Sequence, residues 1–285
     1  MQTLLNSFCG VGIDEKNNTV FVDLTGSDSQ QIDTFKKYVS NSDEIIFNNE
    51  ATKITSTSAT TWYSGEAIHI YDVDNGTWSG CSTGFRAKKL STSGSYWYGF
   101  VTAGHACNTG NQVFFMQSAI DEALIGIVVL SKLNSTVDAA FVALYDGVFE
   151  MANEAYYSNS SGSAVNKDHI ATNVYFTSVA VGRTLVKNGA TTYRTTGAVQ
   201  SNSYDASIDY GSRGTITVND CIKAGYDSDH GDSGGIVYSL YAEGDTEYLV
   251  VGINIASTNN FLGIGDHSLA MKITTILDEL SISLY

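Results

Sequence analysis

Short runs in which apolar and polar residues alternate, the pattern of half-buried β-strands, recur along most of this chain. Near its start, Asn18–Leu24 alternates in this way, Ser29–Val39 places apolar residues at helical spacing, and Glu44–Phe47 is strand-like again. The pattern predicts a small α+β segment over residues 1–61, with a boundary near residue 60. The alternative is that these residues extend the main domain.

Beyond Gly65 the apolar runs are short, rich in β-branched and aromatic residues, and bounded by turn residues. The predicted strands are 67–71, 81–86, 96–103, 112–116, 125–130, 139–144, 174–181, 183–187, 198–200, 215–218, 235–239 and 248–255. A polar run at 158–163 predicts a linker between the two groups. We therefore expect one barrel or sandwich over 62–163 and another over 164–285, which ends in a helix at Leu269–Leu280.

Composition and charge limit the partners that the chain can have. Its 285 residues are enough to bury a sizeable core. The formal net charge of −15 argues against nucleic acid and anionic membrane surfaces, because both reward clusters of Lys and Arg. No apolar run approaches the ~20 residues that a membrane-spanning helix needs. We expect neither a nucleic acid nor a membrane as partner.

The first candidate for chemistry is the sequence GDSGG at Gly231–Gly235. Glycines allow a tight turn and a close approach of substrate to the backbone, so amide N–H groups can converge beside the Ser233 hydroxyl. The same string also fits the nucleophile elbow of an α/β-hydrolase, or a plain glycine-rich turn. A catalytic reading requires a histidine base and a buried acid elsewhere in the chain.

His105 and Asp138 are the best candidates for that base and acid. His105 follows an apolar run and an Ala-Gly pair, and it lies two residues before Cys107. Asp138 is flanked by apolar residues, so we expect it to be at least partly buried and to need a partner such as an imidazole N–H. A strand-end turn is the alternative role for Asp138, and Asp121 and Asp146 are weaker candidates in more polar surroundings.

The order His105, Asp138, Ser233, in the sequences TAGHAC, VDAAFVAL and GDSGG, resembles the chymotrypsin-like serine proteases. More narrowly, it is similar to the secreted bacterial streptogrisin and alpha-lytic protease group. Gly80–Phe85 resembles that group's CSxGF segment, and Val186–Thr192, followed by Thr-Gly at 196–197, resembles its CRSGxTT and CG segments. The resemblance covers roughly residues 62–285, and the first sixty residues resemble the tail of that group's pro-domain.

This resemblance implies an all-β fold of two six-stranded antiparallel barrels, with the active site in the cleft between them. Ser233 would attack the substrate carbonyl, His105 would act as general base and acid, and Asp138 would orient His105. The amides of Gly231 and Ser233 would form the oxyanion hole. We thus expect a secreted, monomeric endopeptidase that forms an acyl-enzyme on protein or peptide substrates, without metal or cofactor. Residues 1–61 would be an intramolecular chaperone or inhibitor of a self-processing zymogen.

The resemblance also pairs two of the four cysteines. Cys81 and Cys107 match a family disulfide beside the histidine loop, which would favour an oxidising, extracytoplasmic setting. Cys9 and Cys221 match no family partner, and we predict that both are free. None of the cysteines has the CxxC spacing of a zinc site.

Asp232 resembles the buried acid that supports the oxyanion loop, and Lys187 stands where the bacterial group has an internal arginine. A lysine offers a point charge in place of a planar fork, so a solvent-exposed Lys187 is the alternative to an Asp232–Lys187 ion pair.

Substrate preference is the least constrained expectation. Asp227 and Ser228 match the base of the primary pocket in trypsin-like members, which implies cleavage after Lys or Arg. However, Ile255, Ala256 and Ser257 replace the usual Ser-Trp-Gly strand along that pocket, so the register can differ.

Two other functions are weaker alternatives to an endopeptidase. An α/β-hydrolase esterase would order its triad Ser, acid, His, which is not the order here. A catalytically silent, protease-like binding protein is the other alternative, although all three triad residues are present. Asp72–Gly76 lacks the later glutamate of a calcium loop, and we predict a hairpin turn there.

Overall fold

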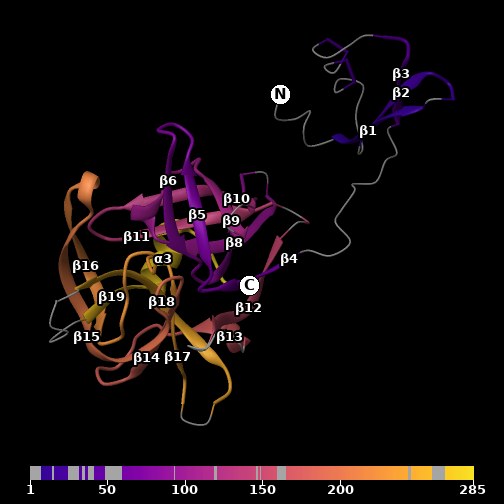
Figure 1. Ribbon diagram of the computed structural model, residues 1–285. Helices are drawn as coiled ribbons and strands as arrows, with labels where there is room; N and C mark the ends of the chain where they lie inside the picture. Colours follow the sequence, from indigo (N-terminus) through magenta and orange to yellow (C-terminus); the bar gives the residue numbers. More distant parts are fainter. Residues whose placement is uncertain are drawn as a thin grey trace. The chain divides into compact units, whose positions relative to one another are not determined.

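The computed structural model divides the chain into two compact units, Met1–Ser58 and Ala59–Tyr285. It describes residues 8–14, 16–24, 32–33, 36–37, 42–48, 60–92, 94–118, 121–145, 147, 149–158, 165–242, 245–258 and 267–285. Of the predicted linker at 158–163, Ser158 is the last residue of a strand and residues 159–163 lie outside the described residues, as does Asp146. Figure 1 shows the elements of both units.

The first unit contains a three-stranded sheet of β1 (Phe8–Asp14), β2 (Thr19–Leu24) and β3 (Ile45–Asn48). β1 and β2 form an antiparallel hairpin, whereas β2 and β3 are parallel. A parallel pair needs a crossover connection, and residues 32–33 and 36–37 within that connection are helical. This mixture of strands and helix is what the alternation and helical spacing predict.

The second unit consists mainly of strands. Their bounds are β4 Thr60–Ser64, β5 Ala67–Asp72, β6 Thr77–Ser82, β7 Arg86–Leu90, β8 Tyr96–Thr102, β9 Gln112–Ser118, β10 Asp121–Leu133, β11 Asp138–Leu144, β12 Phe149–Ser158, β13 Val165–Tyr175, β14 Thr184–Gly189, β15 Tyr193–Asp209, β16 Thr215–Ala224, β17 Ile236–Leu240, β18 Tyr248–Thr258 and β19 His267–Lys272. Two 3₁₀ turns, η1 (Gly104–Ala106) and η2 (Gly211–Arg213), and the helix α3 (Ile273–Leu280) complete the described elements.

The first barrel is a sheet with the order β6-β5-β9-β10-β11-β8-β7 among the described strands. Its edge strands β6 and β7 are consecutive in the chain and are separated only by residues 83–85. Three residues span at most about 10 Å, so the two edges lie near one another and the sheet curls into a barrel. β8 ends at Thr102, just before the turn that carries His105, and β11 begins at Asp138.

The second barrel is a ring of six strands. In the sheet order β17-β14-β15-β16-β19-β18, an additional pairing of β17 with β18 closes the ring. β13, β12 and β4 continue the sheet beside β18, and the β13–β18 and β12–β4 pairs are parallel. In the chain, β4 precedes the strands of the first barrel and β12 follows them, yet the two strands pair with each other in the second sheet.

Three predicted elements differ from the structure, and the first is the strand predicted at 81–86, which is divided between β6 and β7 with residues 83–85 in neither. Leu269–Leu280 is not one helix, because residues 267–272 form β19 and only residues 273–280 are helical. The hydrogen bonds that β19 makes with β16 and β18 outweigh the helical spacing of its apolar residues. The strand predicted at 174–181 ends at Tyr175.

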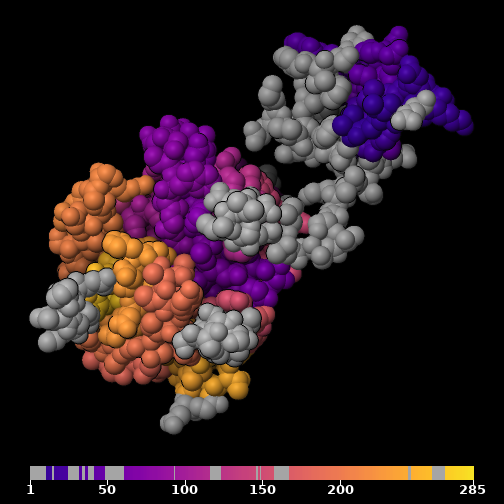
Figure 2. All heavy atoms as spheres, viewed as in Figure 1, coloured from indigo at the N-terminus to yellow at the C-terminus, as the bar shows by residue number. Residues whose placement is uncertain are grey.

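The core lies inside each barrel and between them. One buried cluster fills the first barrel around Ile68, Phe100 and Val142, and a second fills the other barrel around Leu185 and Val237. A third cluster joins residues of both barrels and of α3. Figure 2 shows the first barrel, purple to magenta, against the orange and yellow second barrel. No described helix is long and apolar enough to cross a membrane.

Candidate active site

The three residues predicted as a triad come together at the junction of the two barrels. His105 lies in η1, directly after β8, and Asp138 is the first residue of β11. Ser233 lies in the loop between β16 and β17, in the second barrel. Gly104 lets η1 lie this close to the sheet, because a Cβ there would come within 2.1 Å of the Lys132 carbonyl oxygen.

The hydrogen bonds connect these residues in the order acid, imidazole, hydroxyl. His105 Nδ1 lies 2.7 Å from Asp138 Oδ2, and His105 Nε2 lies 2.9 Å from Ser233 Oγ. The His105 amide donates to the other carboxylate oxygen, Asp138 Oδ1, at 2.8 Å. Because Asp138 is fully buried and accepts from Nδ1, the proton of the neutral imidazole belongs on Nδ1. Nε2 is then free to accept the Ser233 proton.

A third donor to Asp138 comes from a residue that the sequence analysis missed. The Tyr210 hydroxyl donates to Asp138 Oδ2 at 2.9 Å. Tyr210 is 72 residues away from Asp138 in the chain, and it immediately precedes η2 in a polar, turn-like stretch. No local signal in the sequence identifies it.

The loop around Ser233 presents two unused amides. Among the described residues, no hydrogen bond is donated by the N–H of Gly231 or the N–H of Ser233. The Thr191 hydroxyl donates to the His230 carbonyl at 2.6 Å, and in a trans peptide this turns the Gly231 N–H to the opposite side. Gly231 has φ +98°, which favours glycine. These amides are suited to hold an oxyanion.

Ser82 of the first barrel fixes the same loop from the opposite side. Its amide donates to the Ser233 carbonyl at 2.8 Å, and its hydroxyl donates to the Gly231 carbonyl at 2.7 Å. The sequence analysis placed Ser82 only within the CSxGF-like segment and gave it no role. Its two bonds hold the nucleophile loop to the barrel that carries His105.

Asp232 and Lys187 form a buried ion pair, and the alternative of an exposed Lys187 is wrong. Lys187 Nζ lies 3.0 Å from Asp232 Oδ2, and both side chains are 0% exposed. Thr192 Oγ1 and the amides of Thr191 and Asp229 also donate to the Asp232 carboxylate. Burial by itself would raise the pKa of Asp232, but the Lys187 charge and these donors hold that pKa below its usual value.

The five residues expected to form a specificity pocket differ in their exposure to solvent. The Asp227 side chain is exposed, and Ser228 is buried with its hydroxyl 2.8 Å from that of Ser268. Ile255 is buried in the core between the barrels, and Ala256 and Ser257 are half-buried. None of the five lines the described part of the hollow that contains His105 and Ser233.

That hollow, about 820 Å³ in volume, runs instead along the turn of the β5–β6 hairpin. The Asp72 carboxylate accepts hydrogen bonds from the amides of Asp74 and Asn75, which confirms the predicted hairpin turn. It also accepts from Asn108 Nδ2 at 3.1 Å, so the hairpin is tied to the loop after His105. Hydrogen bonds from Asn75 and Asn108 lower the pKa of Asp72, which places a carboxylate in this hollow.

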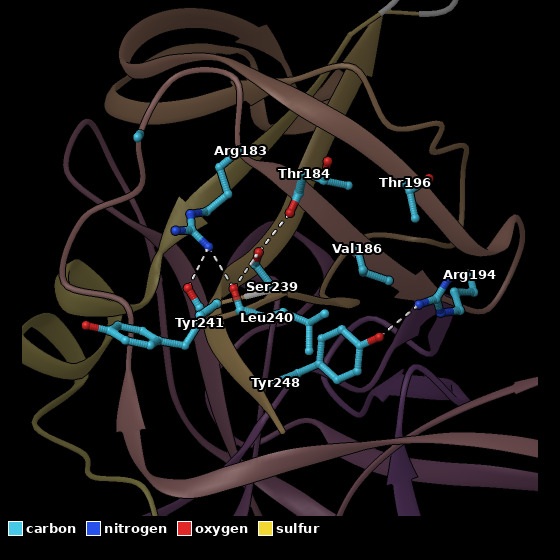
Figure 3. Close-up of a pocket in the computed structure, with 11 residues that line it drawn as sticks. Arg183, Thr184, Val186, Arg194, Thr196, Ser239, Leu240, Tyr241 and Tyr248 are labelled. Carbon is cyan, nitrogen blue, oxygen red and sulfur yellow. Dashed lines mark hydrogen bonds between the residues drawn. The ribbon is translucent and has the colours of Figure 1, made fainter. Parts of the chain in front are cut away.

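A second hollow, of about 620 Å³, lies on the second barrel between Arg183 and Arg194 (Figure 3). Arg183 Nη1 donates to the carbonyls of Leu240 and Tyr241, and Arg194 Nε donates to the Asp168 carboxylate. Both guanidinium groups are therefore engaged within the protein. No triad residue lines this hollow.

The expected Cys81–Cys107 disulfide is wrong for this structure, in which both residues are free thiols. Each sulfur has its own polar contact, Cys81 Sγ with Thr102 Oγ1 at 3.4 Å and Cys107 Sγ with the Ala103 carbonyl at 3.5 Å. Burial raises the pKa of Cys81 to about 12 and raises that of Cys107 as well, so the thiolate that forms disulfides is disfavoured. Cys221 is also a free, buried thiol. The Cys9 side chain lies outside the described residues.

No group of three His, Cys, Asp or Glu side chains suited to a metal ion is found among the described residues. The triad itself consists of groups for proton transfer and nucleophilic attack, which need no metal.

A family model matches the first part of the chain. The family described as the Pro-like C-terminal domain matches residues 1–50. A search of curated proteins found no match.

Solved structures match the larger part of the chain. Nocardiopsis protease aligns with a TM-score of 0.58 at 23% identity and covers 79% of this chain and 99% of its own. Thermobifida fusca protease A aligns with a TM-score of 0.57 at 20% identity, over 79% of this chain and 98% of its own. Cellulomonas bogoriensis chymotrypsin aligns with a TM-score of 0.56 at 21% identity, over 79% of this chain and 99% of its own. These alignments show that the fold is the one that bacterial chymotrypsin-like serine proteases share.

Proposed function

We propose that this chain, which has the fold of the bacterial chymotrypsin-like serine proteases, is a serine endopeptidase that cleaves peptide bonds in protein or peptide substrates. The observation that carries the proposal is the hydrogen-bond chain from Asp138 through His105 to Ser233, with contacts of 2.7 and 2.9 Å. The two unused amides of Gly231 and Ser233 support it, since acyl transfer needs donors where the negative charge develops.

In the proposed mechanism, Ser233 Oγ attacks the scissile carbonyl carbon while His105 Nε2 takes the hydroxyl proton. The Asp138 carboxylate stabilises the imidazolium through Nδ1. The amides of Gly231 and Ser233 hold the tetrahedral oxyanion, where each donor is worth about 3–4 kcal/mol in related enzymes. His105 then gives the proton to the leaving amine, and water hydrolyses the acyl-enzyme by the reverse sequence of proton transfers.

The first unit is proposed to be part of a pro-region that is removed by the protease unit. Two facts support this proposal: residues 1–58 form a compact unit of their own, and residues 1–50 match the Pro-like C-terminal domain. A pro-region can assist folding, inhibit the active site, or do both. Secretion is also proposed, and the match to the Pro-like C-terminal domain is its support. The free Cys81 and Cys107 remove the disulfide argument for an oxidising compartment.

The structure narrows the alternatives. An α/β-hydrolase esterase does not fit, since the sheet of that fold is mainly parallel whereas most strand pairs of this chain are antiparallel. A silent binding protein would have no need of the buried Asp138 bonded to His105. For cleavage after Lys or Arg, the exposed position of Asp227 offers no support.

Labelling with a fluorophosphonate probe tests the function directly, since the probe reacts only with an activated serine. We expect the purified chain to be labelled and to hydrolyse a peptide ester or casein, and we expect Ser233→Ala to do neither. Asp220→Asn, at an exposed site in the same barrel, serves as the folded control. Labelling that persists in Ser233→Ala would exclude the proposed nucleophile.

A further inference from the structure

We propose that Tyr210 is a positioning residue of this active site: its hydroxyl fixes the Asp138 carboxylate from the barrel that carries Ser233. The inference rests on the proposed endopeptidase function. His105 and Asp138 belong to the first barrel and Ser233 to the second, and the Tyr210 contact would hold the two groups in a fixed relative position.

The geometry around Asp138 shows what Tyr210 adds. Two donors to the carboxylate belong to His105 itself, namely its amide at 2.8 Å and its Nδ1 at 2.7 Å. Both therefore come from the first barrel, and both would move with the histidine loop. The Tyr210 hydroxyl, at 2.9 Å from Oδ2, is the donor from the second barrel. It shares Oδ2 with the imidazole, so it restricts rotation of the carboxylate at the oxygen that orients His105.

Tyr210 also contacts the imidazole that Asp138 orients. The ring centroids of Tyr210 and His105 are 5.1 Å apart with an interplanar angle of 37°. The phenol therefore covers one side of the imidazole while its hydroxyl reaches the carboxylate beyond it. A single side chain thus limits both the tilt of His105 and the rotation of Asp138.

The segment that carries Tyr210 is itself attached to the histidine loop. Arg213 Nη2 donates to the Cys107 carbonyl at 3.3 Å and to Asn108 Oδ1 at 3.0 Å. The Tyr210 amide donates to the Gly214 carbonyl at 3.0 Å and so closes the turn that contains Arg213. Through Arg213, the segment 210–213 is therefore hydrogen-bonded to the loop of the first barrel that follows His105.

The phenol keeps its proton in this position. Burial, followed by the adjacent Asp138 charge, raises the pKa of Tyr210, so the hydroxyl remains a donor across the pH range in which a histidine base operates. Besides His105, the thiols of Cys107 and Cys221 interact with the Asp138 charge in the described part of the chain. Burial raises the pKa of both thiols, so they stay neutral over the same range.

Tyr210→Phe tests the inference because it removes the hydroxyl and keeps the ring. A hydrogen bond to a charged group corresponds to roughly a tenfold effect or more, so we expect kcat to fall about tenfold with KM nearly unchanged. We also expect the acid limb of the kcat/KM profile to move to higher pH, because Asp138 without this donor stabilises the imidazolium more strongly. A structural role alone would not move that limb.

Tyr204→Phe is the matched control, since Tyr204 lies in the same β15–β16 hairpin and its ring packs near His267, away from the triad. Rates are expressed per active site by titration with the fluorophosphonate, so that any unfolded fraction does not count. A Tyr210→Phe enzyme with the kcat and pH profile of the parent would overturn the inference. A parent chain that neither reacts with the probe nor cleaves peptides would instead overturn the proposed function.

Discussion

At the scale of single residues, the proposed oxyanion loop depends on the Asp232 carboxylate, whose side chain is 0% exposed. Asp232 accepts hydrogen bonds from Lys187, Thr192 and the amides of Thr191 and Asp229, and these contacts connect the residue before the nucleophile to the end of β14. A buried carboxylate with this many donors organises the backbone around it. The amides of Gly231 and Ser233 on either side are consequently held in place.

Asp232→Asn should therefore impair both stability and activity. The substitution keeps the shape of the side chain but leaves the Lys187 ammonium buried without its counter-charge, which typically costs 3–5 kcal/mol. Asp220→Asn provides the comparison: Asp220 pairs with Lys272 but is 56% exposed, and such pairs contribute about 0–1 kcal/mol. Chemical denaturation of both variants in a Ser233→Ala background measures the difference. Equal losses in the two variants would contradict the structural role given to Asp232.

The residues of the triad show what a sequence can and cannot reveal. His105, Asp138 and Ser233 could be predicted because each lies in a short local pattern of small and apolar residues. Tyr210, Ser82 and Thr191 act through contacts with residues 39 to 149 positions away, so only the folded barrels bring them to the site. The prediction of a Cys81–Cys107 disulfide was wrong for a related reason, because a match of sequence positions does not determine whether two sulfurs are bonded.

At the scale of elements, alternation located most strands, and tertiary pairing decided the rest. β19 has apolar residues at helical spacing, yet it is a strand because it lies between β16 and β18 and hydrogen-bonds to both. The pairing of β4 with β12, far away in the chain, likewise leaves no local signal. These are long-range interactions, which periodicity in one segment does not encode.

The connection between β4 and β5 contains a titratable group that should make stability depend on pH. Glu66 Oε2 accepts the Tyr63 amide at 2.8 Å, and burial raises the pKa of Glu66 from 4.5 to about 7, against the opposing effects of that amide and of Lys167. The folded protein thus holds this proton more tightly than the unfolded chain does. Its stabilising contribution is complete below about pH 4.5 and is lost as the pH rises through about 7.

We expect the melting temperature of the Ser233→Ala protein to fall between pH 5 and 8. The loss in the free energy of unfolding that is due to Glu66 should be about 2 kcal/mol, after allowance for its partial exposure. Glu66→Gln, whose carbonyl can accept the same amide, should flatten this dependence and be the more stable form at pH 8. Glu154→Gln, at a partly exposed pair with Lys167, is the control and should retain the slope. A Glu66→Gln protein with the parent's slope would show that Glu66 titrates as an ordinary surface carboxylate.

At the scale of the whole molecule, the proposed active site lies where the two barrels meet. His105 and Asp138 are held by the first barrel, while Ser233, Tyr210 and the amides are held by the second. The cluster that joins both barrels and α3 should therefore matter for the proposed catalysis as well as for stability.

The two-unit organisation leads to a prediction about processing. If the unit that matches the Pro-like C-terminal domain is a pro-region, the active protease unit should cut the chain near the boundary between Ser58 and Ala59. We expect the purified parent to convert with time to a product that begins close to residue 59, whereas Ser233→Ala stays at its full length of 285 residues. Intact-mass measurement and N-terminal sequencing follow both species.

The conversion should also slow in Tyr210→Phe by the same factor as kcat, since one active site performs both reactions. Cleavage of Ser233→Ala at the same position and rate would assign the cut to a contaminating protease, and a parent that stays intact while it hydrolyses peptides would show that residues 1–58 are a permanent part of the enzyme.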